Sequence, residues 1–506
     1  MGILRLLVLL FLVSCSSTIG SIKHVYHASE LPAESSLESN AYLKLHLNDG
    51  RLVMFRSWEF DSEQKLVSGE GYVYEANRKS RRSINDSTFA ISDCLLAETN
   101  DPQGVNVISP LIMTFPTLIG VITIPCLFDP KACFGSCPTF YSINGDSLKI
   151  QAEGFSSSIS MSLEAEDIDN LDIETTDSVL SLIIKNEAYE THYVRNVKVL
   201  AFPVESQEKV LQTSTGFRKV SGFSRLPNPQ ADPVVRQLTY RDGIEYFSES
   251  DSSNLKVKET IILDVNEQAA GNLGVLITNR QSLLTTFLFY QSIAYMGAGA
   301  GSLLATYERE AQKGHPVPVP IMDMLGGIEV QARINGKWHL IGEVNESGPI
   351  ASDTHLLPVQ MEGTIDQLSL TMTSGLWRID EVALVSMSEA VEPMHLLPYA
   401  LIAGGENNEE LLVKLNDPDQ YLVNLPGTEY RLNFRLPDAV NTELFLSSKG
   451  YYIEWMREDW LKEQDLAMVR MMFLRPGKWL KEMAPRYKAV EPVMEEYFWA
   501  SKFVDP

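Results

Sequence analysis

Residues 328–334 alternate strictly between apolar and polar side chains, and this segment constrains the folding of the chain more than any other. Isoleucine, valine or alanine occupies each even position, and a charged or amide side chain occupies each odd position. A period of two residues is that of a β-strand with one buried face. Asn335-Gly336 follows, a sequence typical of a two-residue turn. The pattern predicts a hairpin whose return strand carries Trp338 and Leu340.

The same kind of signal recurs along the chain and indicates the fold class. Leu43, Leu45 and Leu47 alternate with polar residues, and Asp49-Gly50 supplies a second turn signal. We expect a mainly β fold with antiparallel sheets and a β-sandwich, because many short strands are separated by turn residues. The further predicted strands are residues 52–55, 71–74, 180–184, 197–201, 368–372, 377–384, 411–415, 421–425, 430–436 and 444–447.

Two regions are predicted to be helical. Apolar residues recur at helical spacing over residues 281–312, with a glycine-rich break at 297–301, and a proline-rich linker follows at 316–320. Ile453–Leu474 contains few helix breakers and precedes Pro476-Gly477. The sequence therefore predicts a helical insert near 281–312 and a helical C-terminal tail over 451–506.

The chain has 506 residues, which is too long for one hydrophobic core. We expect several consecutive domains. The predicted segments are 1–14 (signal peptide), 15–39 (lipidated flexible tether), 40–140 (small β domain with a cysteine cluster), 141–270 (β domain), 271–390 (helical insert plus β-sandwich), 391–450 (further strands) and 451–506 (helical tail).

The amino terminus predicts export and lipidation. Arg5 is followed by a short apolar run and then by Leu12-Val13-Ser14-Cys15, which matches the bacterial lipobox. Cleavage before Cys15 leaves that thiol to carry acyl chains such as palmitate, and so predicts an anchor to the membrane of the bacterial cell envelope. Ser16 rather than aspartate follows, as in lipoproteins of the outer membrane. For the apolar residues 105–128, which contain three prolines, buried strands or a packed loop are favoured over a membrane helix.

The net charge limits which partners can be expected, and the cysteine content bears on the redox state of the compartment. The formal net charge of −24 repels nucleic acid and anionic headgroups, so neither is expected as a partner. Outside the cytoplasm, an even number of cysteines favours disulfides over a zinc site, and no C-x-x-C pair is present. Three pairings are open, of which Cys133–Cys137 with Cys94–Cys126 is one. The four cysteines besides Cys15 are Cys94, Cys126, Cys133 and Cys137.

Several short marks resemble a family of uncharacterised bacterial cell-envelope proteins. The most specific is Cys137-Pro138-Thr139-Phe140-Tyr141-Ser142-Ile143-Asn144-Gly145. The resemblance implies an envelope location and this general layout, and it carries no activity. Residues 326–386 also resemble the carbohydrate-binding jelly-roll type of sandwich. The remaining marks are residues 133–136, 151–155, 186–192, 375–380 and 448–452.

No catalytic or metal-binding motif stands out, so no cofactor is expected. The glycines at 297, 299 and 301 lack the spacing of a nucleotide loop, and no H-E-x-x-H pair occurs. The acidic run 164–177 lacks the order of a calcium loop, which favours a solvated acidic face. Glu187, Glu190 and His192 form the best candidate functional cluster, although a turn with satisfied side chains explains them as well.

Aromatic residues in the second half are the candidates for a binding face, because aromatic rings pack on sugars or on partner chains. Burial in the sandwich core is the alternative. We therefore expect a lipid-anchored envelope protein that binds or scaffolds, with an envelope protein or a glycan as partner, rather than an enzyme. The alternative function is a hydrolase of envelope polymers with its site near Glu187 and His192. The candidate aromatics are Trp338, Trp377, Tyr451, Tyr452 and Trp455.

Overall fold

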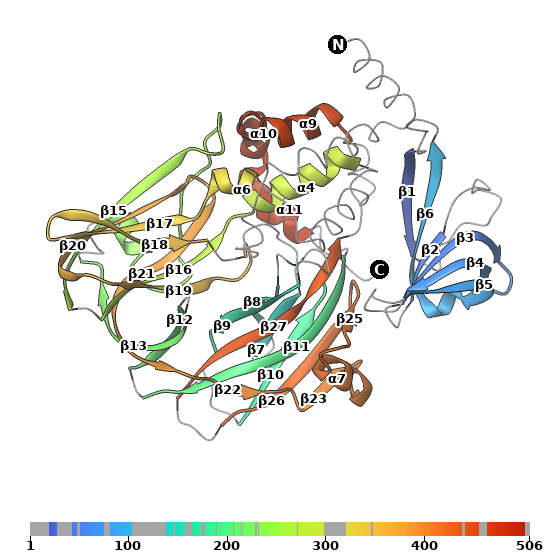
Figure 1. The fold of residues 1–506 in the computed structure, drawn as a ribbon, viewed down its shortest axis with the longest axis horizontal. Coiled ribbons are helices and arrows are strands. Elements are labelled where there is room, and N and C mark those ends of the chain that lie inside the picture. Colours follow the sequence, from blue (N-terminus) through green and yellow to red (C-terminus); the bar gives the residue numbers. More distant parts are fainter. Residues whose placement is uncertain are drawn as a thin grey trace, which may run out of the picture. The chain divides into compact units, whose positions relative to one another are not determined.

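A computed structural model of the chain confirms the mainly β fold (Figure 1). The chain divides into two compact units, each built from discontinuous segments. None of the helices in the described ranges is long and apolar enough to cross a membrane. The structure describes residues 20–27, 43–47, 51–74, 81–103, 138–144, 147–155, 158, 164–173, 178–188, 190–205, 207–213, 215–227, 230, 232–270, 272–297, 320–345, 348–437, 441–454 and 463–500.

The first unit contains a 6-stranded antiparallel sheet, here called sheet A, with strand order β1-β6-β2-β3-β4-β5. Alternating leucines of β2 face its core with Val53 and Phe55 of β3. Residues 20–27 were expected in a flexible tether, but they form β1 and pair with residues 96–103. The elements are β1 (Gly20–His27), β2 (Leu43–Leu47), β3 (Leu52–Asp61), β4 (Leu66–Tyr74), β5 (Arg81–Ala90), η3 (Ile91–Asp93) and β6 (Cys94–Gln103).

The second unit contains two sheets that enclose one core, sheets B and C. Sheet B has strand order β24-β23-β26-β10-β7-β8, and sheet C has order β22-β11-β27-β9 with β25 paired to β11. Sheet B consists of β7 (Thr139–Asn144), β8 (Ser147–Glu153), β10 (Val179–Lys185), β23 (Ala400–Ala403), β24 (Glu406–Asn407) and β26 (Glu429–Arg435). Sheet C consists of β9 (Ala165–Leu171), β11 (Glu190–Pro203), β22 (Met394–Leu396), β25 (Leu422–Asn424) and β27 (Thr442–Glu454).

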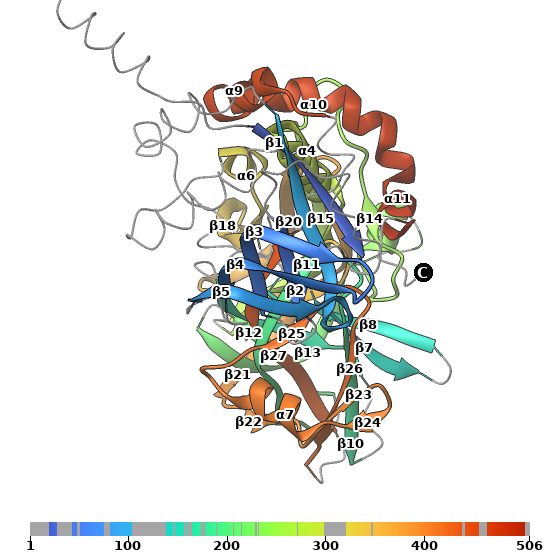
Figure 2. The same cartoon turned by 90° about the vertical axis from the view of Figure 1, so that its right-hand side faces the viewer.

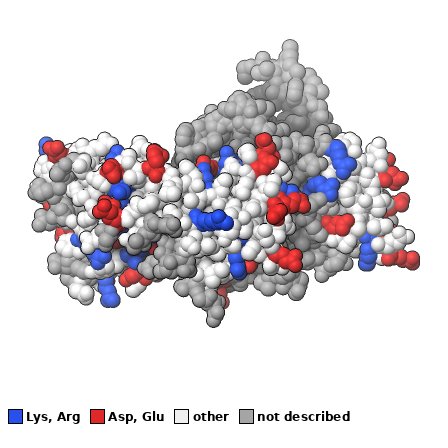
Figure 3. Space-filling view, turned by 90° about the horizontal axis from the view of Figure 1, so that it is seen from below, with Lys and Arg blue, Asp and Glu red and all other residues white. Residues whose placement is uncertain are grey.

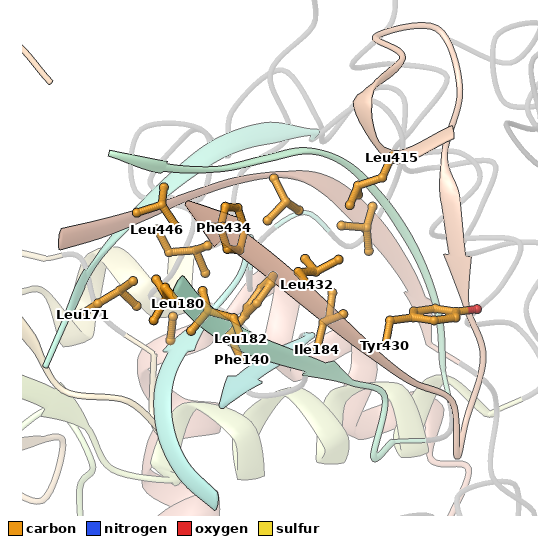
Figure 4. Close-up of a cluster of buried hydrophobic side chains, with 14 of the residues drawn as sticks. Phe140, Leu171, Leu180, Leu182, Ile184, Leu415, Tyr430, Leu432, Phe434 and Leu446 are labelled. Atoms are coloured by element: carbon orange, nitrogen blue, oxygen red, sulfur yellow. The ribbon is translucent and has the colours of Figure 1, made fainter. Parts of the chain in front are cut away.

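The core between sheets B and C explains why these segments form strands (Figure 4). Leu180, Leu182 and Ile184 of β10 point inward at every second position, as the period of a strand requires. Leu432 and Phe434 of the neighbouring β26 meet them. Strands from residues 139–203 and from 394–454 therefore share one sandwich, which corrects the expectation that 391–450 would be a separate segment.

Residues 209–391 supply two further sheets of the second unit, sheets D and E, and are inserted between the two halves of that sandwich. Gly342 of β18 in sheet E lies close to Leu357 of β19 in sheet D: a Cβ added to Gly342 would lie 3.2 Å from Leu357 Cδ2. Sheet D consists of β12 (Lys209–Thr213), β13 (Gly216–Arg225), β14 (Tyr246–Phe247), β16 (Leu273–Gln281), β19 (Asp353–Val359) and β21 (Trp377–Val391). Sheet E consists of β15 (Lys258–Ala270), β17 (Ile328–Ile334), β18 (Lys337–Val344) and β20 (Glu362–Thr373).

A separate apolar cluster joins sheet C to sheet D. Phe202 of β11 and Phe445 of β27 contact Phe217 of β13, with ring centroids 4.7 Å and 5.0 Å from that of Phe217. Val210 of β12 is buried in the same cluster. Sheet C therefore packs against apolar clusters on both of its faces.

Helices lie in both regions that the sequence predicted to be helical, and α3, α6 and α7 are three further helices of the described chain that it did not predict. The described part of the 281–312 region contains α4, and α9 to α11 belong to the C-terminal tail. Figure 2 shows α10 running on toward α11. Residues 411–415 were predicted as a strand but form helix α7, and residues 453–454 end a strand rather than begin a helix. The helices are α3 (Pro233–Gln237), α4 (Leu284–Met296), α6 (Pro320–Leu325), α7 (Glu409–Asn416), α9 (Leu466–Leu474), α10 (Pro476–Val490), η8 (Glu491–Val493) and α11 (Met494–Ala500).

Candidate functional site

Two of the three residues of the predicted polar cluster form a pair. Glu190 and His192 occupy β11 at positions i and i+2, so their side chains leave the strand on the same face. Glu190 Oε1 lies 2.6 Å from His192 Nε2, and both side chains have no exposed surface. The ring of Tyr452 on β27 meets His192 edge to face, at 6.3 Å between centroids.

Glu187 takes part in a different contact. Its Oε2 accepts a hydrogen bond of 2.6 Å from Tyr141 Oη of β7. The neighbouring Asn186 is buried, and its Nδ2 donates to the backbone carbonyls of Glu190 and Asn424. The segment 186–192 therefore ties β7, β11 and β25 together.

This geometry does not favour the hydrolase. A catalytic acid or base must lie within hydrogen-bond reach of a bound substrate. Glu190 and His192 are enclosed by β11, β25 and β27, and no solvent reaches either side chain. The cluster therefore acts as an internal polar contact in this structure.

Glu153, in another of the resemblance marks, also binds backbone. Its Oε2 accepts hydrogen bonds from the amides of Ile350 (2.7 Å) and Ala351 (2.8 Å) in the turn before β19. The Gly348 carbonyl in that turn accepts a hydrogen bond from the amide of Gln281, which pairs with Trp377. The marks at 151–155 and 375–380 are thus joined through one turn.

Two glycines in the marks permit close backbone approach. A Cβ on Gly450 would lie 2.2 Å from the Tyr193 carbonyl oxygen, and one on Gly154 would lie 2.7 Å from Ser448 Oγ. The Gly154 amide also donates to the Pro138 carbonyl. Marks that are far apart in the sequence therefore meet in one unit, and each contributes a structural contact.

The described part of the acidic run is solvated only in part, since Glu166 and Asp172 are exposed and two other acidic residues are buried. Residues 165–171 form β9, in which Asp167 and Asp169 are buried. Asp167 Oδ2 accepts a hydrogen bond from the Phe155 amide at 2.8 Å. Within the described ranges, no group of three or more His, Cys, Asp or Glu side chains is placed to hold a metal ion.

Three of the candidate binding aromatics are core residues. Trp377, Tyr451 and Tyr452 are 2%, 1% and 0% exposed. Tyr451 stacks on Tyr193 with centroids 4.6 Å apart, on the opposite face of β27 from Tyr452. These three rings therefore stabilise the fold and offer nothing to an outside partner, while Trp455 lies beyond the described residues.

Trp338, the remaining candidate, is exposed on sheet E. β17 buries its alternate residues from Ile328 to Ile334, so its polar residues project from the opposite face. On that face Trp338 pairs across the strands with Arg333, whose guanidinium carbon lies 5.9 Å from the ring centroid. Arg333 also holds Asp366 through two hydrogen bonds of 2.7 Å and 2.9 Å.

Leu340 and Ile262 extend this exposed face, with 62% and 57% of their surface accessible. The strand register places them in one row across the sheet, Ile262–Ser369–Gln331–Leu340. We call this outward face of β15, β20, β17 and β18 the sheet E platform. It is a paired sheet surface that carries one aromatic ring, two aliphatic side chains and amide and guanidinium groups.

A small hollow lies on sheet C. It has a volume of about 190 Å³ and is lined by Glu166, Asn196, Lys198, Leu397, Asn416 and Lys449. Burial raises the pKa of Glu166, but hydrogen bonds from Ser447 and Lys198 outweigh it, so this pKa lies below its usual value. The spacing of these residues in the sequence did not predict the hollow, because the pairing of distant strands brings them together.

On the face drawn in Figure 3, acidic and basic side chains are interspersed.

One predicted disulfide cysteine falls in the described part of the chain. Cys94 begins β6 and is buried, and its Sγ donates to the Ala90 carbonyl at 3.3 Å. Cys15, Cys126, Cys133 and Cys137 lie outside the described residues, as do residues 105–128. Lipidation, disulfide pairing and the role of the apolar stretch therefore stay predictions.

Comparison with known proteins adds little. No family model matches the chain, and no curated protein matches it. Among solved structures, one of infectious bursal disease virus, Gt strain, aligns at 10% identity over 95% of this chain and 94% of that one, with a TM-score of 0.15. Dimeric latent PorU from Porphyromonas gingivalis aligns at 9% identity over 85% of this chain and 31% of that one, with a TM-score of 0.14. At such TM-scores neither likeness bears on this chain.

Proposed function

We propose that this chain is a lipid-anchored protein of the bacterial cell envelope that binds a glycan on the sheet E platform. The single observation that carries the binding role is the exposed Trp338, which lies beside Leu340 on a sheet whose other face is core. Exposed apolar groups that are rimmed by polar ones mark interaction sites. The absence of solvent access to Glu190 and His192 favours binding over hydrolysis.

The chemistry of the platform suits a sugar chain. An aromatic ring presents a flat apolar face on which the CH face of a sugar can stack. Arg333 with Asp366, and Gln331 in the next row, present planar hydrogen-bonding groups beside that ring. An extended partner is expected, because the register spreads these groups over four strands rather than around a deep cavity.

A co-sedimentation assay with insoluble cell-wall glycan tests this role. Trp338→Ala should weaken binding at least about tenfold, as is usual for a central aromatic contact. Tyr240→Ala is the matched control, because Trp338 and Tyr240 are both 40% exposed and Tyr240 lies outside the platform. Equal binding by both variants and the unchanged protein would exclude the platform as the glycan-binding site. Binding of an envelope protein instead of glycan would favour a scaffolding role.

The anchor is a separate part of the proposal and rests on the lipobox. Acylation of Cys15 would hold the folded units at the membrane, and an oxidising compartment would allow Cys94, Cys126, Cys133 and Cys137 to form two disulfides. Mass spectrometry of the native amino-terminal peptide should detect acyl chains on Cys15. Cys15→Ser should move the protein from the membrane fraction to the soluble one; an unmodified terminus at Met1 would contradict the anchor.

A further inference from the structure

The outward face of sheet B carries four large apolar side chains that solvent can reach. The inward face of this sheet is core, because alternate residues of β10 and β26 are buried between sheets B and C. Each of the four side chains has between 40% and 43% of its surface accessible. Exposed apolar groups that gather on one face are typical of an interaction site. The four are Ile143 of β7, Leu148 of β8, Val179 of β10 and Tyr399, which precedes β23.

The register of the strands brings these side chains together. Ile143 pairs directly with Leu148 in the β7–β8 hairpin, which Figure 2 shows standing out from the neighbouring strands. The register of β7 and β10 places Ile143 beside Ser181 on its other side. Val179, two residues before Ser181 on the same face of β10, pairs with Arg435 of β26. The apolar side chains therefore belong to one surface that extends from β8 to β26.

Two arginines of β26 share this outward face. Arg431 and Arg435 alternate with Leu432 and Phe434, which point into the core, and both arginines are exposed. The guanidinium carbon of Arg435 lies 4.9 Å from the ring centroid of Tyr399. Arg431 lies between the outward isoleucines of β10 and β23. Both cations thus project among apolar side chains.

The charges of the two arginines are not balanced by carboxylates. Among the residues that the structure describes, neither Arg431 nor Arg435 forms an ion pair. Glu429, on the same strand, pairs instead with Lys185 at 2.8 Å. Four residues along a strand span about 13 Å, so the face presents two separate cations. In a chain of net charge −24, this face is a local exception that attracts acidic groups.

We propose that this face of sheet B binds an acidic, extended segment of a partner polypeptide. Two carboxylates of that segment pair with Arg431 and Arg435, in the planar geometry that guanidinium and carboxylate groups share. Apolar side chains between the carboxylates cover Ile143, Leu148 and Val179. An extended segment is expected because its own side chains recur with the period of the strands below it. The surface uses no residue of the sheet E platform, so it is independent of glycan binding there.

Two other occupants fit the face less well. In a symmetric contact, a second copy of the chain would present the same face, and the arginines of both copies would meet without a counter-charge. A membrane would have to take up the apolar side chains together with Arg435, which lies between Val179 and Tyr399. A guanidinium group is costly in hydrocarbon, whereas a carboxylate of a polypeptide can pair with it.

Fluorescence anisotropy of the whole folded protein with a labelled synthetic peptide tests the proposal. In this peptide two glutamates, four residues apart, flank a valine, and serines fill the other positions. The peptide should bind, and added salt should weaken the binding because the contact is ionic. The same peptide with glutamine in place of glutamate should bind about tenfold more weakly, or less, since both charge pairs are lost.

Substitutions on the face separate the ionic contribution from the apolar one. Replacing both arginines, Arg431→Gln with Arg435→Gln, should weaken binding of the glutamate peptide about tenfold or more. Arg236→Gln on α3 is the matched control, because this arginine is exposed and lies outside the face. Ile143→Ser should also weaken binding, whereas Ile244→Ser, at another exposed isoleucine, should not. Circular dichroism checks that each variant is folded.

The outcomes that would overturn the proposal are distinct. Equal binding of the glutamate and glutamine peptides, or binding of neither, would exclude the arginines as a site for acidic segments. Binding to phosphatidylglycerol vesicles but not to the peptide would identify a membrane surface instead. A dimer in sedimentation velocity that Ile143→Ser dissociates would identify a second copy. Co-sedimentation with glycan should be unchanged in the arginine variant, so failure here is distinguishable from failure of the platform.

Discussion

Glu190 Oε1 and His192 Nε2 lie 2.6 Å apart on one strand, and neither side chain is exposed. The two residues are candidates for catalysis by their chemistry, and the structure places both on the inward face of β11 without accessible surface. A buried polar pair of this kind is costly to break, since the partner that remains is left without compensation. Their role is therefore measured as stability.

Replacing one member of this pair should destabilise the protein strongly. We expect Glu190→Ala to lower the free energy of unfolding by about 3–5 kcal/mol, because His192 stays buried without its partner. Urea denaturation followed by tryptophan fluorescence measures the change. Glu410→Ala breaks the exposed pair with Lys414 on α7 and should change stability far less. Equal effects of the two substitutions would contradict the burial of the β11 pair.

Glycine 450 tests the packing between β27 and β11. Gly450→Ala would place a Cβ 2.2 Å from the Tyr193 carbonyl oxygen, so backbone must move, at a cost of about 3 kcal/mol or more. Gly477→Ala is the contrast, because a Cβ there would have 3.7 Å to Met324 Sδ in α6. At the start of α10, alanine should leave stability unchanged or raise it by up to about 1 kcal/mol. Melting temperatures of the two variants should therefore shift in different directions or by very different amounts.

Glu443 at the start of β27 should make stability depend on pH. Burial raises the pKa of this carboxyl, while Lys209 and Arg241 only partly oppose the shift. A carboxyl whose pKa is raised in the folded state stabilises the fold fully below its unfolded pKa of about 4.3. This stabilisation is lost as the pH rises through the pKa of the folded state. Glu443→Gln should therefore stabilise the protein at neutral pH, and the gain should vanish in acid.

The control for this pH effect is Glu410→Gln. Lys414 lowers the pKa of Glu410, so this substitution should remove stability at neutral pH and have no effect in acid. Urea midpoints measured across the acidic and neutral range distinguish the two signs. A Glu443→Gln variant that is less stable at neutral pH would show that the carboxylate is stabilised as an ion.

Asn408 should hold the first turn of α7. Its Oδ1 accepts a hydrogen bond of 3.0 Å from the Leu411 amide, as an N-cap does. Asn408→Ala should cost about 1 kcal/mol, whereas Asn408→Asp should restore the cap. Chemical denaturation of both variants gives the comparison, and an unchanged midpoint for the alanine variant would exclude the cap.

The alternation of apolar and polar residues was enough to predict a strand where that strand buries only one face. The alternation at Ile328–Ile334 and the Asn335-Gly336 turn predicted β17 and β18, and the structure confirms both. The pattern fails at 411–415, where an apolar run predicts a strand but the structure has helix α7. The N-cap residue Asn408 and the acidic pair Glu409-Glu410 are signals for the start of a helix, and they agree with α7.

Trp338 of the candidate site was predicted from the sequence, but the residues that lie around it were not, because pairing between distant strands brings them together. Tyr451 and Tyr452 leave β27 on opposite faces, so the strand period predicts one exposed ring, yet sheet C is covered on both sides and both are buried. Ile262 and Leu340 share a row only through the register of β15, β20, β17 and β18. Such registers depend on tertiary contacts that single-strand patterns do not encode.

The insertion of residues 209–391 between the halves of the B–C sandwich also sets the order of events during biosynthesis. The side chains of Ser181 and Asn433 hydrogen-bond across 252 positions, and Glu166 and Ser447 across 281. Sheets D and E can close as soon as their own residues have left the ribosome, but β10 must wait for β26 while its apolar face stays unprotected. Nascent copies of this protein should therefore depend on a holding chaperone until almost the last strand has been made.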